Sequence, residues 1–245
     1  MRIVSLVPSI TQTLFDFGLD HSEIVGRTKF CIHPADRVKE VPVIGGTKNL
    51  KPDKIKALKP DLIIANKEEN DREQVLELEK EFRVWVTDIK TLEDHKSFLH
   101  ELGQVLHKPD EATHFIQKTD NIFGGIKPGK SIPTAYLIWK GPYMTVGGDT
   151  FIHDIMSRLG LLNIFGKQLR YPTVEFSELQ TAELVLLSSE PYPFKQKHIA
   201  ELQEQLPNAT IMLADGEAFS WYGTRILQYG SYFHQLTGGL EEPFD

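Results

Sequence analysis

The sequence predicts an α/β protein of two lobes with largely parallel sheets, joined by one long helix, with a ligand cleft between the lobes. Two segments of similar pattern, beginning at Leu58 and Ala182, carry this prediction. Each runs through a short apolar strand, a turn bearing carboxylates, an amphipathic helix and a second strand that ends in Asp88 or Asp215. This alternation favours parallel pairing. Because ligands of such sheets bind outside the carboxyl ends of the strands, we expect the cleft there.

The first lobe is expected to span residues 1–107. Its predicted strands are Arg2–Val7, Ile24–Gly26, Leu62–Ala65 and Val84–Thr87. Its predicted helices are Ile10–Phe17, Pro52–Leu58, Asp71–Glu81 and Thr91–His107. Ser9 and Gln12 have the spacing of a capping box, so they predict where the first helix begins.

A connecting helix is expected within residues 108–130, from Pro109 to about Phe123. Proline is accepted in a first helical turn, and the glycines at 124 and 125 end the helix. The segment 126–132, which includes Pro128, leads into the second lobe. No flexible Gly/Ser-rich linker divides the halves, so a helix rather than a hinge loop is expected to join them.

The second lobe is expected to span residues 131–245. Its predicted strands are Thr134–Trp139, Tyr143–Val146, Ala182–Ser189 and Thr210–Leu213. Its predicted helices are Thr150–Leu159, Pro193–Gln205 and Thr224–Leu236. Asp149 is placed to cap the first of these helices, and Ser177 with Gln180 repeats the capping-box spacing.

Composition excludes several classes of function. The chain has 245 residues, of which 40% are hydrophobic and 25% charged, and a formal net charge of −7. Nucleic-acid binding requires clustered Lys and Arg, so we expect no nucleic-acid partner. Cys31 is the only cysteine, so no internal disulfide forms. No apolar stretch approaches the roughly 20 residues that span a membrane.

Aromatic and polar side chains are concentrated in loops at the expected carboxyl ends of the strands. The rings provide contact area for a large planar or aromatic ligand, and Arg225 can pair with a carboxylate or phosphate. The alternative is that about half of the aromatic side chains close the lobe cores. The candidate ligand-binding residues are Phe30, Cys31, His33, Gly46, Thr47, Lys48 and Asn66 in the first lobe and Trp139, Tyr143, Tyr171, Trp221, Tyr222 and Arg225 in the second.

Cys31 and His33 are also candidates for metal binding or catalysis. Thiolate and imidazole suit zinc or copper, but a structural zinc site needs four ligands and this loop supplies two, so no metal site is predicted. Glu190 or Tyr192 could complete a set only if the lobes closed on it. As a nucleophile, Cys31 lacks a residue that would orient the imidazole of His33. The sequence contains no nucleophile elbow, P-loop, Rossmann glycine fingerprint or zinc-protease helix signature. The histidines on predicted helices, such as His95, are expected at the surface.

Three segments resemble the helical-backbone (class III) substrate-binding proteins of ABC importers, which serve the uptake of cobalamin, haem and iron-siderophores. They are the opening Arg2–Thr11, the loop Gly45–Asn49 and the segment Ile55–Ile63. The cobalamin-binding branch is the most similar, although these motifs do not fix the ligand. The resemblance implies two α/β lobes bridged by one long helix.

The resemblance also implies partners. The bound metal chelate is transported cargo rather than a cofactor, and the receptor, expected to be a monomer, docks on a permease dimer. In this family each lobe carries an exposed acidic residue that contacts arginines of one permease subunit. The matching residues are Glu68, Asp71 and Glu73 in the first lobe and Glu190 in the second.

The leading interpretation is therefore a non-catalytic receptor that captures a metal chelate and delivers it to a permease. The family is exported, yet a strand follows Met1-Arg2 directly and no signal peptide is recognisable. A periplasmic or membrane-anchored location is implied if a leader has been removed. A cytosolic corrinoid- or metal-binding protein or sensor is the alternative, and an enzyme using Cys31 and His33 is the third.

Overall fold

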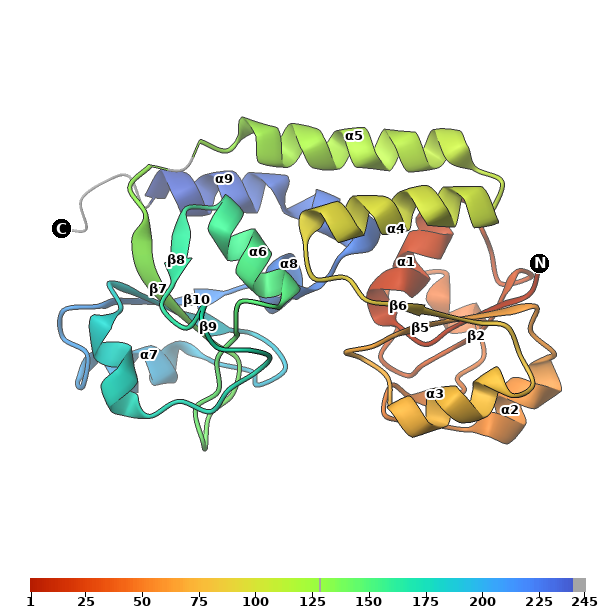
Figure 1. Cartoon of the computed structure of the whole chain (residues 1–245), viewed down its shortest axis with the longest axis horizontal. Coiled ribbons are helices and arrows are strands. Elements are labelled where there is room, and N and C mark those ends of the chain that lie inside the picture. The colour runs from red at the N-terminus through yellow and green to blue at the C-terminus, as the bar shows by residue number, and fades with distance from the viewer. Residues whose placement is uncertain (128, 240–245) are drawn as a thin grey trace. The chain divides into compact units, whose positions relative to one another are not determined.

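A computed structural model describes residues 1–127 and 129–239 and shows two compact units, each built on a four-stranded sheet (Figure 1). Unit 1 comprises Met1–Ile89, Asp94–Ile116 and Tyr222–Arg225. Unit 2 comprises Lys90–Glu93, Gln117–Trp221 and the described residues from Ile226 onward. Both sheets are parallel throughout, so the predicted α/β class with two parallel sheets is confirmed.

The helix α5 (Pro109–Gly125) carries the chain from unit 1 into unit 2, which it enters at Gln117. Its bounds agree with the predicted connecting helix. The expected division at 107/108 and 130/131 stays a prediction, and positions 128 and 240–245 lie outside the described residues. Across the described part, no helix is both long and apolar enough to cross a membrane.

The unit 1 sheet has the strand order β2-β1-β5-β6. Its strands are β1 (Ile3–Ser5), β2 (Ile24–Arg27), β5 (Leu62–Asn66) and β6 (Val84–Thr87). Each matches a predicted apolar run. The central strand β5 is buried along its whole length, as expected for a parallel sheet covered on both faces.

Four helices cover the two faces of this sheet. They are α1 (Pro8–Asp16), α2 (Pro52–Leu58), α3 (Arg72–Glu79) and α4 (Leu92–Val105). Figure 1 shows α2 and α3 on one face and α1 and α4 on the other. Val4, Ile63 and Ala65 of the sheet pack in one buried cluster with Ile55 of α2 and Val75 of α3. Smaller elements are the hairpin β3 (Gly45–Gly46) and β4 (Asn49–Leu50) and the short 3-10 helix η1 (Val38–Glu40).

The predicted capping box of Ser9 and Gln12 is wrong. Pro8 is the first helical residue, and Val7 before it is extended, which makes Val7 the N-cap. The reason is steric, because a proline ring disfavours helical geometry in the preceding residue while its own φ suits a first turn. Ser9 therefore lies inside α1, and Gln12 is buried.

Tyr222 and Arg225 were predicted in the second lobe, but the segment Tyr222–Arg225 belongs to unit 1. Thr224 N donates to Thr13 Oγ1 (3.1 Å) and Thr224 Oγ1 to Asp16 Oδ2 (2.5 Å). Gly223 N donates to Nδ1 of His95 (3.0 Å). His95 is fully buried for this reason, so its expected surface position is also wrong.

The unit 2 sheet has the order β10-β9-β7-β8. Its strands are β7 (Ile132–Leu137), β8 (Leu161–Asn163), β9 (Leu184–Ser188) and β10 (Thr210–Ala214). Sequence reasoning missed β8, a short edge strand. The predicted strand Tyr143–Val146 is wrong, because this segment pairs only through isolated bridges from Met144 to Trp139 and to Thr173.

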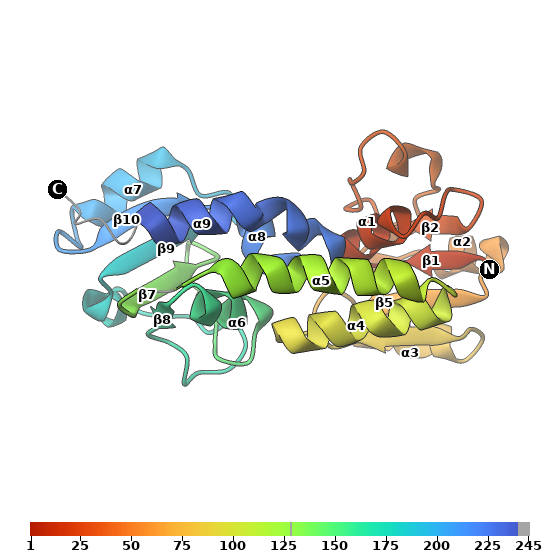
Figure 2. The same cartoon turned by 90° about the horizontal axis from the view of Figure 1, so that it is seen from above.

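Unit 2 contains the helices α6 (Phe151–Arg158), α7 (Gln196–Gln203), α8 (Gly216–Ser220) and α9 (Gly230–Gly239) and the 3-10 helices η2 (Phe176–Thr181) and η3 (Gly223–Tyr229), of which η3 begins in unit 1. The predicted final helix from Thr224 is thus η3 followed by α9. In Figure 2, α9 lies beside α5, and the rings of Phe123 and Phe233 are 5.5 Å apart.

Two predicted helix caps in unit 2 are replaced by neighbours. Thr150 caps α6 by accepting from His153 N (3.2 Å), whereas Asp149 Oδ1 accepts from Arg170 N (2.5 Å). Glu175, rather than Ser177, is the N-cap of η2. In both cases several side chains near the helix start can accept a hydrogen bond, and long-range packing decides which one does.

We predict that Gly223→Ala destabilises unit 1. Gly223 has φ +76°, and an added Cβ would lie 2.1 Å from Thr13 Oγ1, which already accepts a hydrogen bond from Thr224. Positive φ and overpacking together cost about 2–4 kcal/mol of unfolding free energy. Urea denaturation measures this loss. Gly124→Ala is the control, since no atom lies within 4 Å of its added Cβ. Equal stability of the two variants would contradict the prediction.

Candidate functional site

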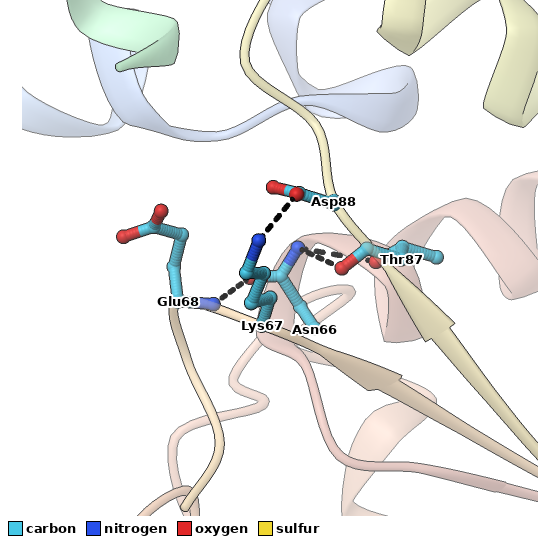
Figure 3. Close-up of polar contacts among 5 residues, drawn as sticks. All are labelled: Asn66, Lys67, Glu68, Thr87 and Asp88. Carbon is cyan, nitrogen blue, oxygen red and sulfur yellow. Dashed lines mark hydrogen bonds and ion pairs between the residues drawn. The ribbon is translucent and has the colours of Figure 1, made fainter. Parts of the chain in front are cut away.

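The loop that follows β5 is shaped by the buried side chain of Asn66. Its Nδ2 donates to both O and Oγ1 of Thr87 (3.1 Å each), and its Oδ1 accepts from the backbone of Glu68 (2.8 Å) and Glu69 (3.2 Å). Figure 3 shows these contacts to Thr87 and Glu68 at the ends of β5 and β6. Asn66 is only 1% exposed, so its amide serves the loop and does not face a ligand.

Asn70 and Gln74, which were not predicted as site residues, attach this loop to its neighbours. Asn70 Nδ2 donates to the backbone oxygens of Leu6 and Thr47 (3.1 Å each). Gln74 accepts from Leu50 N (2.7 Å) and donates to Lys48 O (3.0 Å). The β3–β4 hairpin is therefore held in place by two amides. The only available signal was an asparagine soon after a buried strand.

The hairpin itself requires glycine at its first position. Gly45 has φ +130°, and an added Cβ would lie 2.4 Å from Asn49 O. The turn presents Lys48, whose Nζ donates to Glu68 O (2.6 Å), while Thr47 is nearly buried. Beside the turn, Phe30 is 49% exposed and Lys29 Nζ lies 4.9 Å from its ring centroid.

These residues line a hollow of about 530 Å³ on unit 1. Its lining contains the candidate residues Phe30, Gly46, Thr47 and Lys48, so the structure brings four of the predicted binding residues together. The full lining is Lys29, Phe30, Val43, Gly45, Gly46, Thr47, Lys48, Asn49, Lys51 and Lys54.

Cys31 does not line this hollow. Its side chain is 1% exposed, and its Sγ lies 3.0 Å from Thr11 Oγ1 and 3.2 Å from Thr28 Oγ1. Burial raises the pKa of the Cys31 thiol, which disfavours the thiolate that a metal or a nucleophilic reaction would need. His33 is half-buried. Within residues 1–127 and 129–239, no group of three or more His, Cys, Asp or Glu side chains could hold a metal ion.

Tyr222 is likewise buried, at 6% exposure, with its ring edge-on to Phe98 of α4 (6.2 Å). Burial raises the pKa of its phenol, so the group is neutral. Arg225 is half-buried in the same segment. Tyr222 therefore acts as core of unit 1, which was the alternative role considered for half of the aromatic candidates.

The acidic residues after β5 differ in burial and in whether their carboxylates cap a helix. Asp71 caps α3, its Oδ1 accepting from Gln74 N (3.0 Å), whereas Glu73 is exposed. Lys67 pairs with Asp88 (2.9 Å), and the carboxylate of Glu68 points away from this pair in Figure 3. Of the three docking candidates after β5, Asp71 thus uses its carboxylate as a helix cap, Glu68 is half-buried and Glu73 is exposed.

In unit 2, Trp139 follows the carboxyl end of β7 and is 40% exposed. Its ring lies edge-on to Tyr192 (5.7 Å), which in turn contacts Phe194 (4.7 Å). Tyr143 packs against the hydrophobic core of this unit. Tyr171 is half-buried, with the Arg170 guanidinium 5.8 Å from its ring centroid.

Glu190 was expected to be exposed, and this is wrong. Its Oε1 accepts from Ser220 Oγ (2.8 Å) and from Trp221 Nε1 (2.9 Å), which turns the half-buried carboxylate toward α8. Close contact with Gly216 permits this, because a Cβ on Gly216 would lie 2.4 Å from Glu190 Cγ. Burial raises the pKa of the Glu190 carboxyl, and the charge of Glu217 adds to the rise. Glu190 therefore positions the indole of Trp221.

Comparison with known proteins gives the family. Residues 3–190 match the family model described as periplasmic binding protein. The chain belongs to the periplasmic binding protein family. The vitamin B12-binding protein of Vibrio campbellii is 24% identical over 188 residues, which are 74% of this chain and 68% of the relative. This match confirms the resemblance to substrate-binding proteins that the sequence motifs indicated.

Solved structures of family members have the same fold. The periplasmic vitamin B12-binding protein of Vibrio cholerae superposes with a TM-score of 0.80 at 19% identity and covers 98% of each chain. A periplasmic heme-binding protein of Pseudomonas aeruginosa gives 0.79 at 20% identity, covering 100% of this chain and 95% of the other. Because relatives with different ligands match equally well, the fold does not select the ligand.

We predict that Glu190→Gln changes how stability depends on pH. The folded pKa of Glu190 is raised above its ordinary value of 4.5, so its stabilising contribution is complete below the unfolded pKa and is lost as pH rises through the folded pKa. Glutamine can accept the same bonds from Ser220 and Trp221 without this loss. The unfolding free energy of the wild type minus that of the variant should therefore fall from about pH 4 to pH 8.

Glu201→Gln is the matched control for this measurement. Glu201 is exposed and its pKa is lowered by the hydrogen bond from Lys140, so its contribution has the opposite sign and is lost as pH falls. Urea denaturation across the pH range compares the two. The structural account would be contradicted if the difference in unfolding free energy between the wild type and Glu190→Gln did not vary with pH. It would also be contradicted if this difference rose with increasing pH, as is expected for Glu201→Gln.

Proposed function

We propose that this protein is the substrate-binding protein of an ABC importer, which captures a metal chelate and delivers it to the permease. The observation that carries the proposal is the family match over residues 3–190, joined to two parallel sheets whose carboxyl edges present aromatic side chains. Relatives include proteins named for binding vitamin B12 and heme, so the chelate is a cobalamin-like corrinoid, haem or a ferric siderophore.

The contacts we propose come from exposed or half-buried candidates on each unit. In unit 1 they are Phe30, His33, Gly46, Lys48 and Arg225. Thr47 is added to them because it lines the hollow, although it is only 9% exposed. In unit 2 they are Trp139, Tyr143, Tyr171 and Trp221. Cys31, Asn66 and Tyr222 are buried, and we assign them to the support of the unit 1 loops instead.

Capture requires no covalent chemistry, and we propose that the protein is not an enzyme. The burial of Cys31 supports this view. The enzymatic alternative needs the Cys31 thiolate as its nucleophile, and burial favours the protonated thiol. The chelate is cargo and not a cofactor. We further propose that the protein acts outside the cytoplasm as a monomer, because its relatives are periplasmic receptors.

We predict that the purified chain binds cyanocobalamin, haemin or a ferric siderophore, observed as a change in the absorbance of the chelate. Trp139→Ala should weaken binding by about 1–3 kcal/mol, because its exposed ring loses a stacking contact. Leu162→Ala removes an apolar side chain that is 56% exposed on the edge strand β8 and should leave affinity unchanged. Absence of binding to all three chelates would refute the proposed cargo.

Docking on the permease is proposed to use the acidic loop of unit 1. Glu68→Lys with Glu73→Lys should abolish transport in vesicles that contain the permease, while chelate affinity is kept, since charges at a docking rim mainly set orientation and association rate. Glu79→Lys, a charge reversal at the opposite end of α3, is the control. In unit 2 the resemblance points to Glu190, whose carboxylate would first have to leave Ser220 and Trp221.

Normal transport by the double variant would favour the cytosolic binder or sensor over the receptor. The difference in transport between the wild type and the double variant should also become smaller as salt is added. Salt weakens docking of the wild type, because exposed charge pairs are screened beyond about 8–10 Å at physiological ionic strength. Asp71 is left unchanged in this test, since its replacement would remove the cap of α3.

A further inference from the structure

The hollow on unit 1 has an unusual charge. Four of its ten lining residues are lysines, namely Lys29, Lys48, Lys51 and Lys54, and none is Asp or Glu. The chain as a whole carries 34 acidic and 27 basic residues. A positive hollow on a negative protein attracts anions, because the field of like charges around one concave surface is additive.

The ammonium groups are available. Among the residues that the structure describes, none of the four lysines forms an ion pair with a carboxylate. Lys48 Nζ donates to Glu68 O, a bond that keeps its full charge and fixes its direction. Lys29 lies over the Phe30 ring. Four like charges in one hollow repel one another, and a bound anion would relieve this repulsion.

The hollow also offers apolar surface, and its hairpin is held in place by hydrogen bonds. Phe30 is 49% and Val43 is 40% exposed in its lining, so it offers apolar surface beside the charges. Asn70 and Gln74 hold the hairpin through the backbone of Thr47, Lys48 and Leu50. A loop that is already ordered loses little entropy when a ligand binds.

We infer that this lysine hollow binds the anionic group of the cargo, a carboxylate or a phosphate attached to an apolar body. The inference rests on the proposed function and narrows it, because it selects chelates that carry a carboxylate or phosphate group over chelates that lack one. Lysine suits this role as a point charge that does not demand bidentate geometry, so either anion is accepted.

The test compares the triple variant Lys29→Gln, Lys51→Gln and Lys54→Gln with the wild type. Lys48 is left in place because its bond to Glu68 shapes the turn. The control is Lys39→Gln, Lys56→Gln and Lys80→Gln, which removes three exposed lysines of unit 1 outside the hollow. Absorbance titrations use haemin against haemin dimethyl ester, and cyanocobalamin against dicyanocobinamide, which lacks the phosphodiester.

We expect the triple variant to bind the member of the bound pair that carries the carboxylates or the phosphodiester at least about tenfold more weakly, with a shallower dependence on salt. Its affinity for the member that lacks this group should equal that of the wild type, and the control should match the wild type throughout. If the triple variant binds the member with the anionic group as the wild type does, the inference is overturned while the proposed function stands.

A third experiment measures the binding of tripolyphosphate, a free anion, by calorimetry. It tests the anion site even if the wild type binds none of the chelates. Binding that the triple variant loses and the control keeps would support an anion site in the hollow while the proposed function fails. Absence of lysine-dependent binding to tripolyphosphate would then overturn the inference as well.

Discussion

Parallel pairing of the strands is the constraint on which the loops of this protein depend. A parallel sheet is covered on both faces, so its strands are apolar and polar side chains are confined to the ends. In unit 1 all of β5 is buried, and Asn66 is its last residue. In unit 2 the same holds for β9, which ends at Ser188 just before Glu190. Each sheet therefore gathers its polar and exposed aromatic groups at one edge.

Buried polar side chains then fix the loops at that edge. The amides of the buried Asn66 and Asn70 and of the half-buried Gln74 form hydrogen bonds with the backbone of Thr87 at the end of β6, of Leu6 just after β1, and of the β3–β4 hairpin. A buried amide with all its bonds satisfied specifies one loop geometry, because any other would leave donors unpaired at a cost of about 1–3 kcal/mol each. Glu190 does the same for Trp221 in unit 2, at the cost of partly burying a carboxylate. The exposed Lys48, whose backbone oxygen accepts from Gln74, is thus held in place before a ligand arrives.

Sequence patterns predicted the elements that depend on local periodicity. The apolar runs marked β2, β5 and β6 closely, and α2 was predicted with its observed bounds Pro52–Leu58. Helix caps were predicted less well, since proline at position 8 shifted the start of α1 and Thr150 competed with Asp149. Partners far apart in the chain left no signal. Thr224 bonds Thr13 across 211 positions, and only such contacts place Tyr222 in unit 1.

The candidate site was predicted by residue type but not by burial. Phe30, Lys48 and Trp139 were selected as loop side chains after strands, and they are exposed. Cys31 and Asn66 were selected by the same rule and are buried, because whether a loop side chain turns inward depends on hydrogen-bond partners supplied by other segments, such as Thr11 and Thr87. The lysine hollow was not predicted, since Lys29, Lys51 and Lys54 meet only through the hairpin.

The central proposal is that the chelate binds to loops that follow the carboxyl ends of the strands in each unit. Amide hydrogen exchange, measured by mass spectrometry with and without the chelate found to bind, tests it most directly. The account predicts slower exchange in residues 28–34 and 45–49 of unit 1 and in residues 139–144 and 215–221 of unit 2, with no change near the amino ends of β5 and β9. Protection confined to the amino ends of the strands, or to helix surfaces away from these loops, would contradict it.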